Sequence, residues 1–147
     1  MISNFILDKI FEFFPFKPTS EQDLALRALS EFLVSGESDR VLLLKGYAGT
    51  GKTTMLGATV KMMDALQQKA VLLAPTGRAA KVFAEYACHD AFTIHRKIYR
   101  QKSFPDEFSG FSIADNLHKD TVFIVDEASM ISNENTGAAI FGSGRLL

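Results

Sequence analysis

The chain has 147 residues, of which 47% are hydrophobic and 22% charged, as in an ordinary folded domain and unlike a disordered or collagenous chain. Its single cysteine excludes an intramolecular disulfide and a cysteine-based zinc cluster, and its three histidines lack the close pairing that would indicate a structural metal. A net charge of −1 argues against a generally basic nucleic-acid binder, although residues 69–102 hold seven basic and two acidic side chains, a local net of +5.

The first 36 residues predict two helices. Asp8, Lys9 and Glu12 interrupt the apolar opening, which has no basic residue before it and so differs from a signal peptide. No apolar run approaches the ~18 residues needed to cross a membrane, and we expect a cytoplasmic protein without a membrane partner. The first helix should end at Phe14, before Pro15. The second should begin with a capping box formed by Thr19 and Gln22 and end at Gly36.

Residues 37–147 predict an α/β domain. Three short apolar runs, at residues 41–45, 70–74 and 121–125, have the composition of parallel strands that are buried on both faces. Helical patterns cover residues 52–68, 77–87 and about 94–100, and a polar stretch leads to the last strand. Alternating strands and helices predict a parallel sheet flanked by helices. A short helix should follow Glu127, and nothing after it reads as a further buried strand.

A glycine-rich loop lies between the first predicted strand and the helix after it. Its sequence, GYAGTGKTT, satisfies G-x-x-x-x-G-K-[ST] in the strand–loop–helix context that this motif requires. Glycines let successive backbone N–H groups curl around an anion, and the helix adds the dipole of its N-terminus. Lys52 is then expected to reach the β- and γ-phosphates, and the Thr53 hydroxyl to ligate Mg²⁺. The alternative, an ordinary flexible turn, fits this context poorly.

An acidic pair follows the last predicted strand, in the stretch VFIVDEAS. Asp126 can hold Mg²⁺ together with Thr53, and Glu127 can orient or deprotonate a water that attacks the γ-phosphate. Alternatively, the two carboxylates could simply favour the N-terminus of a short helix. Together with the glycine-rich loop, the pair favours ATP hydrolysis.

Five segments in order carry a resemblance: TSEQ, GYAGTGKTT, APTGRAAKVF, TIHRKIY and VDEASMI. They resemble the first half of superfamily 1 DNA helicases of the RecD-like branch, from about residue 17 to residue 132. The resemblance implies a RecA-like P-loop NTPase fold with an N-terminal helical extension. It also implies ATP and Mg²⁺ as cofactors, and single-stranded DNA as partner.

The resemblance implies roles for single residues. Gln22 would read the adenine base, although the capping box competes for the same amide, which we do not expect to make both sets of bonds at once. The catalytic residues would be Lys52 and Glu127, and the metal ligands Thr53 and Asp126. The nucleotide would contact Gln22, Gly46, Tyr47, Ala48, Gly49, Thr50, Gly51, Lys52, Thr53 and Thr54. The DNA would contact Pro75, Thr76, Gly77, Arg78, Thr93, His95 and Arg96.

Some of the residues in and around these DNA-contacting segments also have an alternative role that does not involve DNA. Arg78 and Lys81 could form a solvated helix face, and His95 could make only local hydrogen bonds. Phe92 and Tyr99 could stack on a base, but we expect them to pack in the core.

The chain also departs from the family. It lacks the Gly-Asp-x-x-Gln-Leu segment that senses the γ-phosphate, and the second RecA-like domain that supplies an arginine finger. In this family the strand with the sensor lies between the strand of the glycine-rich loop and the Asp-Glu strand. We therefore expect an incomplete sheet, in which residues 41–45 pair directly with residues 121–125, or else a poorly folded chain. Marginal stability and little unaided catalysis follow.

The sequence thus predicts the ATP-hydrolysing motor half of a DNA helicase that moves along single-stranded DNA, completed by a second RecA-like domain. A nucleotide-binding module without helicase activity of its own is the alternative. A small nucleoside kinase is disfavoured, because its lid needs several arginines and only Arg145 follows Arg100.

Overall fold

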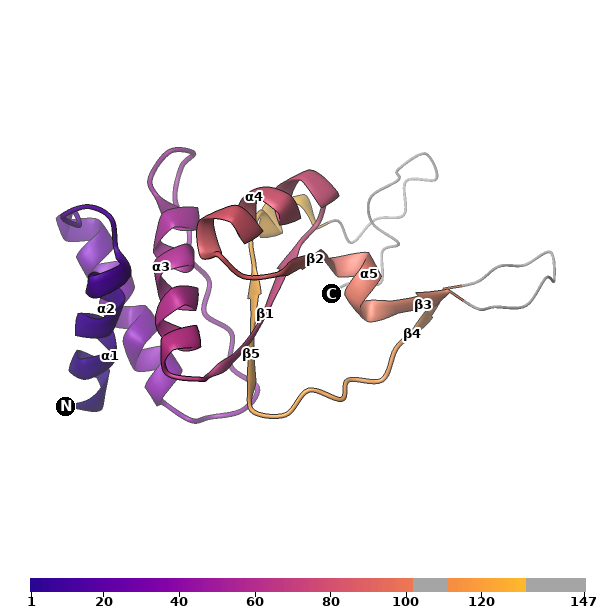
Figure 1. Cartoon of the computed structure of the whole chain (residues 1–147), viewed down its shortest axis with the longest axis horizontal. Helices are drawn as coiled ribbons and strands as arrows, with labels where there is room; N and C mark the ends of the chain where they lie inside the picture. The colour runs from indigo at the N-terminus through magenta and orange to yellow at the C-terminus, as the bar shows by residue number, and fades with distance from the viewer. Residues whose placement is uncertain (102–110, 132–147) are drawn as a thin grey trace. The chain divides into compact units, whose positions relative to one another are not determined.

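The computed structural model describes residues 1–101 and 111–131. Figure 1 labels the helices and strands. The chain divides by its internal contacts into two compact units. The first unit comprises residues 1–68 together with residues 86–88, and the second comprises residues 69–85 and the chain from residue 89 onward. The predicted boundary between residues 36 and 37 stays a prediction.

The first unit is helical. Its helices are α1 (Ile2–Phe13), α2 (Ser20–Val34) and α3 (Lys52–Ala65), and α1 packs against both of the others. Apolar side chains that recur at helical spacing on α1 form the centre of this packing, since Ile6, Leu7 and Ile10 are buried. Helix α3 is buried along much of its length, which explains the run of small and apolar residues after its first turn.

The predicted ends of the helices are largely confirmed. Helix α1 ends at Phe13, one residue before the predicted end. At the start of α2 the Thr19 side chain accepts from the Gln22 backbone N–H while the Gln22 side chain accepts from the Thr19 N–H, which completes the capping box. Gly36 follows the C-cap with a left-handed φ of 63°. Helix α3 ends at Ala65, short of the predicted residue 68, and Gln67 already has a left-handed φ of 57°.

The second unit contains a parallel sheet. Its strands are β1 (Lys69–Ala74), β2 (Ala91–Thr93) and β5 (Thr121–Val125), in the order β2-β1-β5. Helix α4 (Gly77–Ala87) follows β1, and α5 (Ile94–Ile98) follows β2 directly. An antiparallel pair, β3 (Tyr99–Gln101) and β4 (Phe111–Ile113), and a 3₁₀ turn, η1 (Ala128–Met130), complete the described elements.

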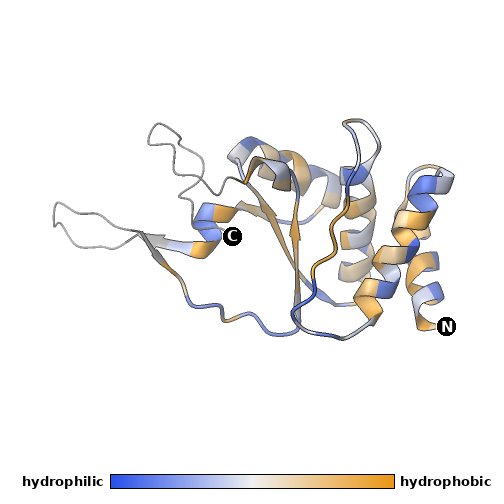
Figure 2. Ribbon diagram, turned by 180° about the vertical axis from the view of Figure 1, so that it is seen from behind, coloured by the Kyte–Doolittle hydropathy of each residue, from blue (hydrophilic) through white to orange (hydrophobic). Residues whose placement is uncertain are grey.

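The core of the second unit surrounds β1. Four consecutive residues of this strand, Val71 to Ala74, are buried, as expected of a central parallel strand that is covered on both faces. A cluster of Val71, Leu73 and Ile94 is packed by Phe92, Ile98, Val125 and Ile131, so the expectation that Phe92 belongs to the core is confirmed. The hydrophobic colouring of β1 and β5 in Figure 2 follows this arrangement. The α/β fold with a parallel sheet flanked by helices is thus observed.

The prediction of a strand at residues 41–45 is wrong. In the described chain residues 41–47 belong to no helix or strand, and Val41 and Leu43 are 91% and 64% exposed. Figure 2 shows this segment as a hydrophobic coil. The expected direct pairing with residues 121–125 therefore does not form. An apolar run becomes a strand only where a neighbour takes its N–H and C=O groups, and the described strands offer it none.

Smaller differences concern the rest of the second unit. Strand β5 has the predicted bounds, but it is an edge strand with Phe123 43% exposed, so it is not buried on both faces. Strands β2, β3 and β4 were not predicted, because runs of three residues are too short to show a period. Helix α5 ends at Ile98, before the predicted residue 100. In the described chain no helix is long and apolar enough to span a membrane.

Candidate nucleotide and nucleic-acid sites

The glycine-rich loop, residues 46–51, leads into helix α3 in the first unit. Gly49 and Gly51 have left-handed φ values of 78° and 87°, which only glycine adopts readily. Gly51 is the N-cap of α3 and has no side chain with which to cap this end, whereas Thr19 caps α2 and Thr93 caps α5. A helix N-terminus without a side-chain cap after such a loop suits an oxygen-rich anion. The loop therefore fits the triphosphate of a nucleotide.

Lys52 closes the loop with its side chain. Its Nζ donates to the carbonyl oxygens of Gly46 and Tyr47, both at 2.7 Å. The Thr50 hydroxyl donates to the same Tyr47 carbonyl at 2.8 Å. These bonds hold an ammonium group over the loop, where a phosphate could compete for it. Tyr47 itself is 89% exposed.

Gln22 joins helix α2 to this loop. Its Oε1 accepts from the Thr19 N–H at 3.0 Å, and its Nε2 donates to the Thr50 carbonyl at 2.9 Å. The capping box uses only one of the two lone pairs on Oε1. Capping therefore leaves a lone pair on Oε1, and the contact of this amide with a base stays a prediction. The Thr50 carbonyl was not foreseen as a partner, since a backbone group 28 residues away leaves no trace in the sequence.

The acidic pair lies at the carboxyl end of β5 in the second unit. The Asp126 N–H donates to the Leu73 carbonyl at 3.0 Å and so extends the pairing of β5 with β1 beyond Val125. One carboxylate oxygen of Asp126 accepts from the Glu127 N–H at 2.9 Å. Glu127 is exposed, has a left-handed φ of 54° and precedes η1. This backbone presents the Glu127 carboxylate to solvent just beyond the sheet.

The predicted DNA-contacting segments follow β1 and β2. Ala74 pairs with Thr93 and Leu73 pairs with Val125, so Pro75, Ile94 and Asp126 begin at the same edge of the sheet. Parallel strands bring their carboxyl ends together in this way. The Thr76 and Thr93 hydroxyls accept from the N–H groups of Ala79 and Arg96, at 3.1 and 3.3 Å, and so cap α4 and α5. Both threonines therefore have a structural role that is independent of DNA.

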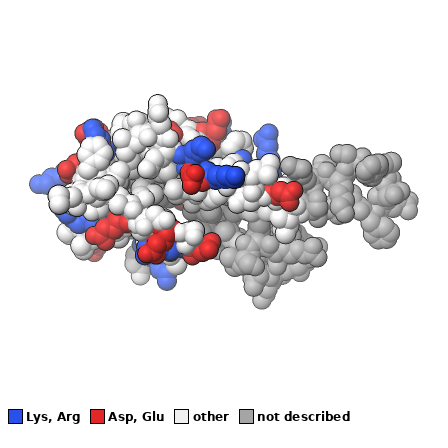
Figure 3. Space-filling view, turned by 90° about the horizontal axis from the view of Figure 1, so that it is seen from below, with Lys and Arg blue, Asp and Glu red and all other residues white. Residues whose placement is uncertain are grey.

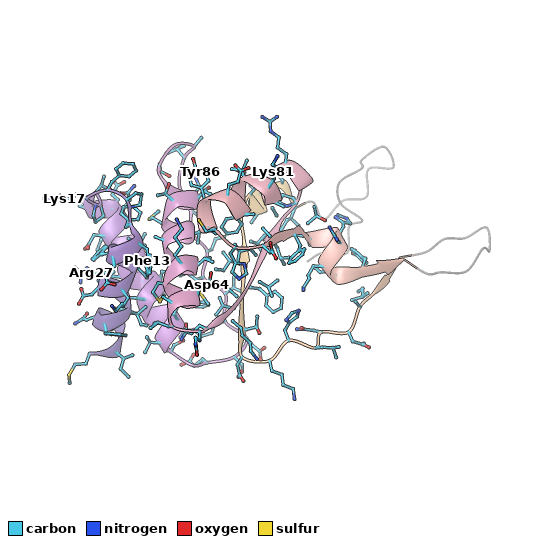
Figure 4. The ribbon with its side chains drawn as sticks, viewed as in Figure 1. Phe13, Lys17, Arg27, Asp64, Lys81 and Tyr86 are labelled. Carbon is cyan, nitrogen blue, oxygen red and sulfur yellow. The ribbon has the colours of Figure 1, made fainter. Side chains whose placement is uncertain are left out.

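Basic side chains accompany these segments. Arg78 and Lys81 on α4 and Arg96 on α5 are exposed, and Figure 4 labels Lys81. Lys97 lies 5.1 Å from the centre of the Phe92 ring, which holds its ammonium by a cation–π contact. The His95 and Tyr99 rings lie 5.5 Å apart. On the face shown in Figure 3, basic and acidic side chains are interspersed.

The predicted site residues thus fall into two groups. The first unit brings Gln22 together with residues 46–54, including Ala48 and Thr54, and the second gathers the DNA-contacting segments with Asp126 and Glu127. The predicted magnesium site takes Thr53 from the first unit and Asp126 from the second, and it stays a prediction.

Comparison with known proteins shows the family to which the chain is similar. The family model described as an AAA domain matches residues 19–140. An uncharacterized protein of Methanocaldococcus jannaschii is 35% identical over 130 residues, covering 80% of this chain and 11% of that protein. The ATP-dependent RecD2 DNA helicase of Deinococcus radiodurans is 33% identical over 94 residues, covering 63% and 13%. The multifunctional conjugation protein TraI of Escherichia coli is 34% identical over 131 residues, covering 84% and 7%. The chain therefore spans at most 13% of the length of these three relatives.

Proposed function

This chain belongs to the AAA domain family, and we propose that it binds and hydrolyses ATP as the motor half of a DNA helicase that moves along single-stranded DNA. The observation that carries the proposal is the start of α3. Two left-handed glycines, the second of them the N-cap, lead into the helix N-terminus, with the Lys52 ammonium held beside it. This arrangement supports a triphosphate ligand.

The proposed roles follow from the chemistry of each group. Lys52 would exchange the carbonyls of Gly46 and Tyr47 for phosphate oxygens. Thr53 and Asp126 carry the oxygen ligands that Mg²⁺ prefers, and the ion would neutralise charge on the phosphates. The exposed carboxylate of Glu127 would orient the attacking water and take its proton.

The DNA-binding part of the proposal rests on the sheet edge and on the relatives. The segments that begin at Pro75 and at Thr93 lie at one edge of the sheet, with exposed Arg78 and Arg96 beside them. Backbone N–H groups and arginines at such an edge can hold the phosphates of a single strand. One relative is named a DNA helicase. The second RecA-like domain that such a motor needs would belong to the complete protein.

A nucleotide-binding module without helicase activity is the second candidate. The contacts of Lys52 support it equally, because exchanging the loop carbonyls for phosphate oxygens requires only that a nucleotide binds. Both candidates predict ATP binding, and they differ in DNA-stimulated turnover.

The test measures Mg-ATP binding and hydrolysis with and without a single-stranded oligonucleotide. Lys52→Ala should abolish tight ATP binding, and Glu127→Gln should keep binding while lowering turnover by about 10²- to 10⁴-fold. The controls are Lys61→Ala, on the same helix as Lys52, and Glu31→Gln on α2, which should both behave as the unchanged chain.

DNA-stimulated turnover that is lost in both site variants would support the motor. Binding without turnover would favour the nucleotide-binding module. ATP binding that survives Lys52→Ala unchanged would refute the proposed site.

A further inference from the structure

The Gln22 amide is held at both ends in the first unit. Thr19 donates its backbone N–H to Oε1 at 3.0 Å, and Thr50 receives a hydrogen bond from Nε2 at 2.9 Å. A Cβ atom on Gly51 would lie 2.8 Å from Nε2, so the amide also fits closely against the backbone of the loop. Gln22 therefore has a fixed position beside the glycine-rich loop.

These two bonds also fix which end of the amide is oxygen. A flipped amide would face the Thr19 N–H with its own N–H groups, and the Thr50 carbonyl with its oxygen. Both contacts would then be repulsive. Each end of the amide makes one side-chain bond within the described chain, so one lone pair on Oε1 and one hydrogen on Nε2 remain for a ligand.

An acceptor beside a donor is the complement of adenine. The adenine base presents its N6 donor next to its N7 acceptor, whereas guanine presents two acceptors, O6 and N7. An amide that cannot rotate would make two bonds to adenine, but it would set Oε1 against an acceptor of guanine. An amide that is free to rotate could instead turn away from guanine, and water would then hydrogen-bond to the guanine acceptors.

We propose that Thr19 is a positioning residue, whose backbone N–H fixes the Gln22 amide and thereby sets a preference for adenine over guanine nucleotides. The inference rests on the proposed function, since it assumes that a nucleotide binds at the loop. Without the hydrogen bond from the Thr19 N–H, the Gln22 amide is no longer preorganised, which weakens ATP binding. The amide can then also turn away from guanine, which relieves the repulsion that disfavours GTP. Both effects move the ratio of the two affinities toward one.

The experiment uses proline to remove one hydrogen. Thr19 has a φ of −69°, which proline adopts without strain, so Thr19→Pro removes the N–H donor while keeping the backbone conformation. Ser20→Pro is the matched control, because proline suits the first position of a helix and leaves the Thr19 N–H in place. Thr19→Ala, which loses the hydroxyl and keeps the N–H, measures the contribution of the hydroxyl.

The dissociation constants of ATP, GTP and inorganic tripolyphosphate are measured for each protein. We expect ATP to bind about tenfold or more tightly than GTP to the unchanged chain and to Ser20→Pro. In Thr19→Pro the preference should fall to about twofold, while tripolyphosphate binding is unchanged. Gln22→Glu keeps the capping box but loses the Nε2 donors, and it should lose the preference as well.

Three results would overturn the inference and leave the proposed function standing. One is equal binding of ATP and GTP by the unchanged chain. Another is a preference for ATP that survives Thr19→Pro but not Gln22→Glu, which would mean that Gln22 reads the base without the hydrogen bond from the Thr19 N–H. The third is an equal loss of ATP, GTP and tripolyphosphate binding in Thr19→Pro, which would mean that the link serves the loop alone. No binding of any of these ligands by the unchanged chain would instead refute the proposed function.

A measurement on the unchanged chain covers the case in which Thr19→Pro does not fold. Side-chain NMR relaxation of the Gln22 amide should give an order parameter near that of a rigid backbone, about 0.85. A value below about 0.6 would show a freely moving amide and would overturn the inference that Thr19 fixes it.

Discussion

At the scale of single residues, Gly57 shows how closely the first unit is packed. A Cβ atom at this buried position of α3 would lie 3.0 Å from the Tyr86 carbonyl oxygen and 3.2 Å from its carbon. Both contacts are with backbone, which cannot rotate away as the end of a side chain can. Glycine is therefore required here by the close approach of two segments, although it weakens a helix by about 1 kcal/mol relative to alanine.

Gly57→Ala should lower the free energy of unfolding by about 1 kcal/mol, since overpacking costs about 1–3 kcal/mol and better helix propensity returns about 1 kcal/mol. The control is Gly77→Ala at the start of α4, where no described atom lies within 4 Å of the added Cβ. It should leave the free energy of unfolding unchanged or raise it by up to about 1 kcal/mol. Urea unfolding measures both variants, and a more stable Gly57→Ala would contradict the contact with Tyr86.

Single residues were predictable where the pattern is local. The capping box follows from Thr19 and Gln22, three positions apart, and the glycines at the start of α3 follow from a motif within residues 46–53. The bond from Gln22 to the Thr50 carbonyl was not predictable, because it depends on how two distant segments pack. Nor does the sequence show that Lys52 binds the carbonyls of its own loop, because the motif is the same whichever groups the lysine contacts.

At the scale of elements, residues 41–45 and β1 carry similar apolar runs with different outcomes. Both are rich in leucine and valine, and composition alone predicts a buried strand for each. Strand β1 pairs on both sides, with β2 and with β5, whereas residues 41–45 belong to no described strand. A strand is defined by its neighbours, which a local pattern does not report. Composition therefore predicted the central strand and failed for the other run.

A matched pair of leucines tests this difference. Leu43 is 64% exposed and Leu72 is fully buried at the centre of β1. Leu43→Ala should change the free energy of unfolding by no more than about 0.5 kcal/mol, as at other surface positions. Leu72→Ala should lower it by about 2–5 kcal/mol, because it leaves a cavity in the core. Chemical unfolding measures both variants, and equal losses of unfolding free energy would indicate that residues 41–45 form a buried strand.

At the scale of the whole molecule, the distribution of charge matters more than its total. The chain has a net charge of −1, while residues 69–102 have a local net of +5. Single-stranded nucleic acid releases counterions where its phosphates meet Lys and Arg, so a local cluster can bind it although the total is slightly negative. The sequence predicted this cluster, because charge is counted without knowing the fold. The placement of Arg78 and Arg96 just after the carboxyl ends of β1 and β2 required the register of these strands.

The salt dependence of binding to single-stranded DNA tests whether the cluster contacts the strand. The logarithm of the binding constant falls with the logarithm of salt concentration, with a slope of about −0.7 for each phosphate neutralised on a single strand. Arg96→Gln should therefore weaken binding to all sequences alike and make the slope shallower by about 0.7. Arg40→Gln removes an arginine outside the cluster, one that pairs with Glu37 at 3.3 Å, and should leave the slope unchanged. If both variants shift the slope equally, the attraction comes from total charge and the sheet edge does not define the path of the DNA.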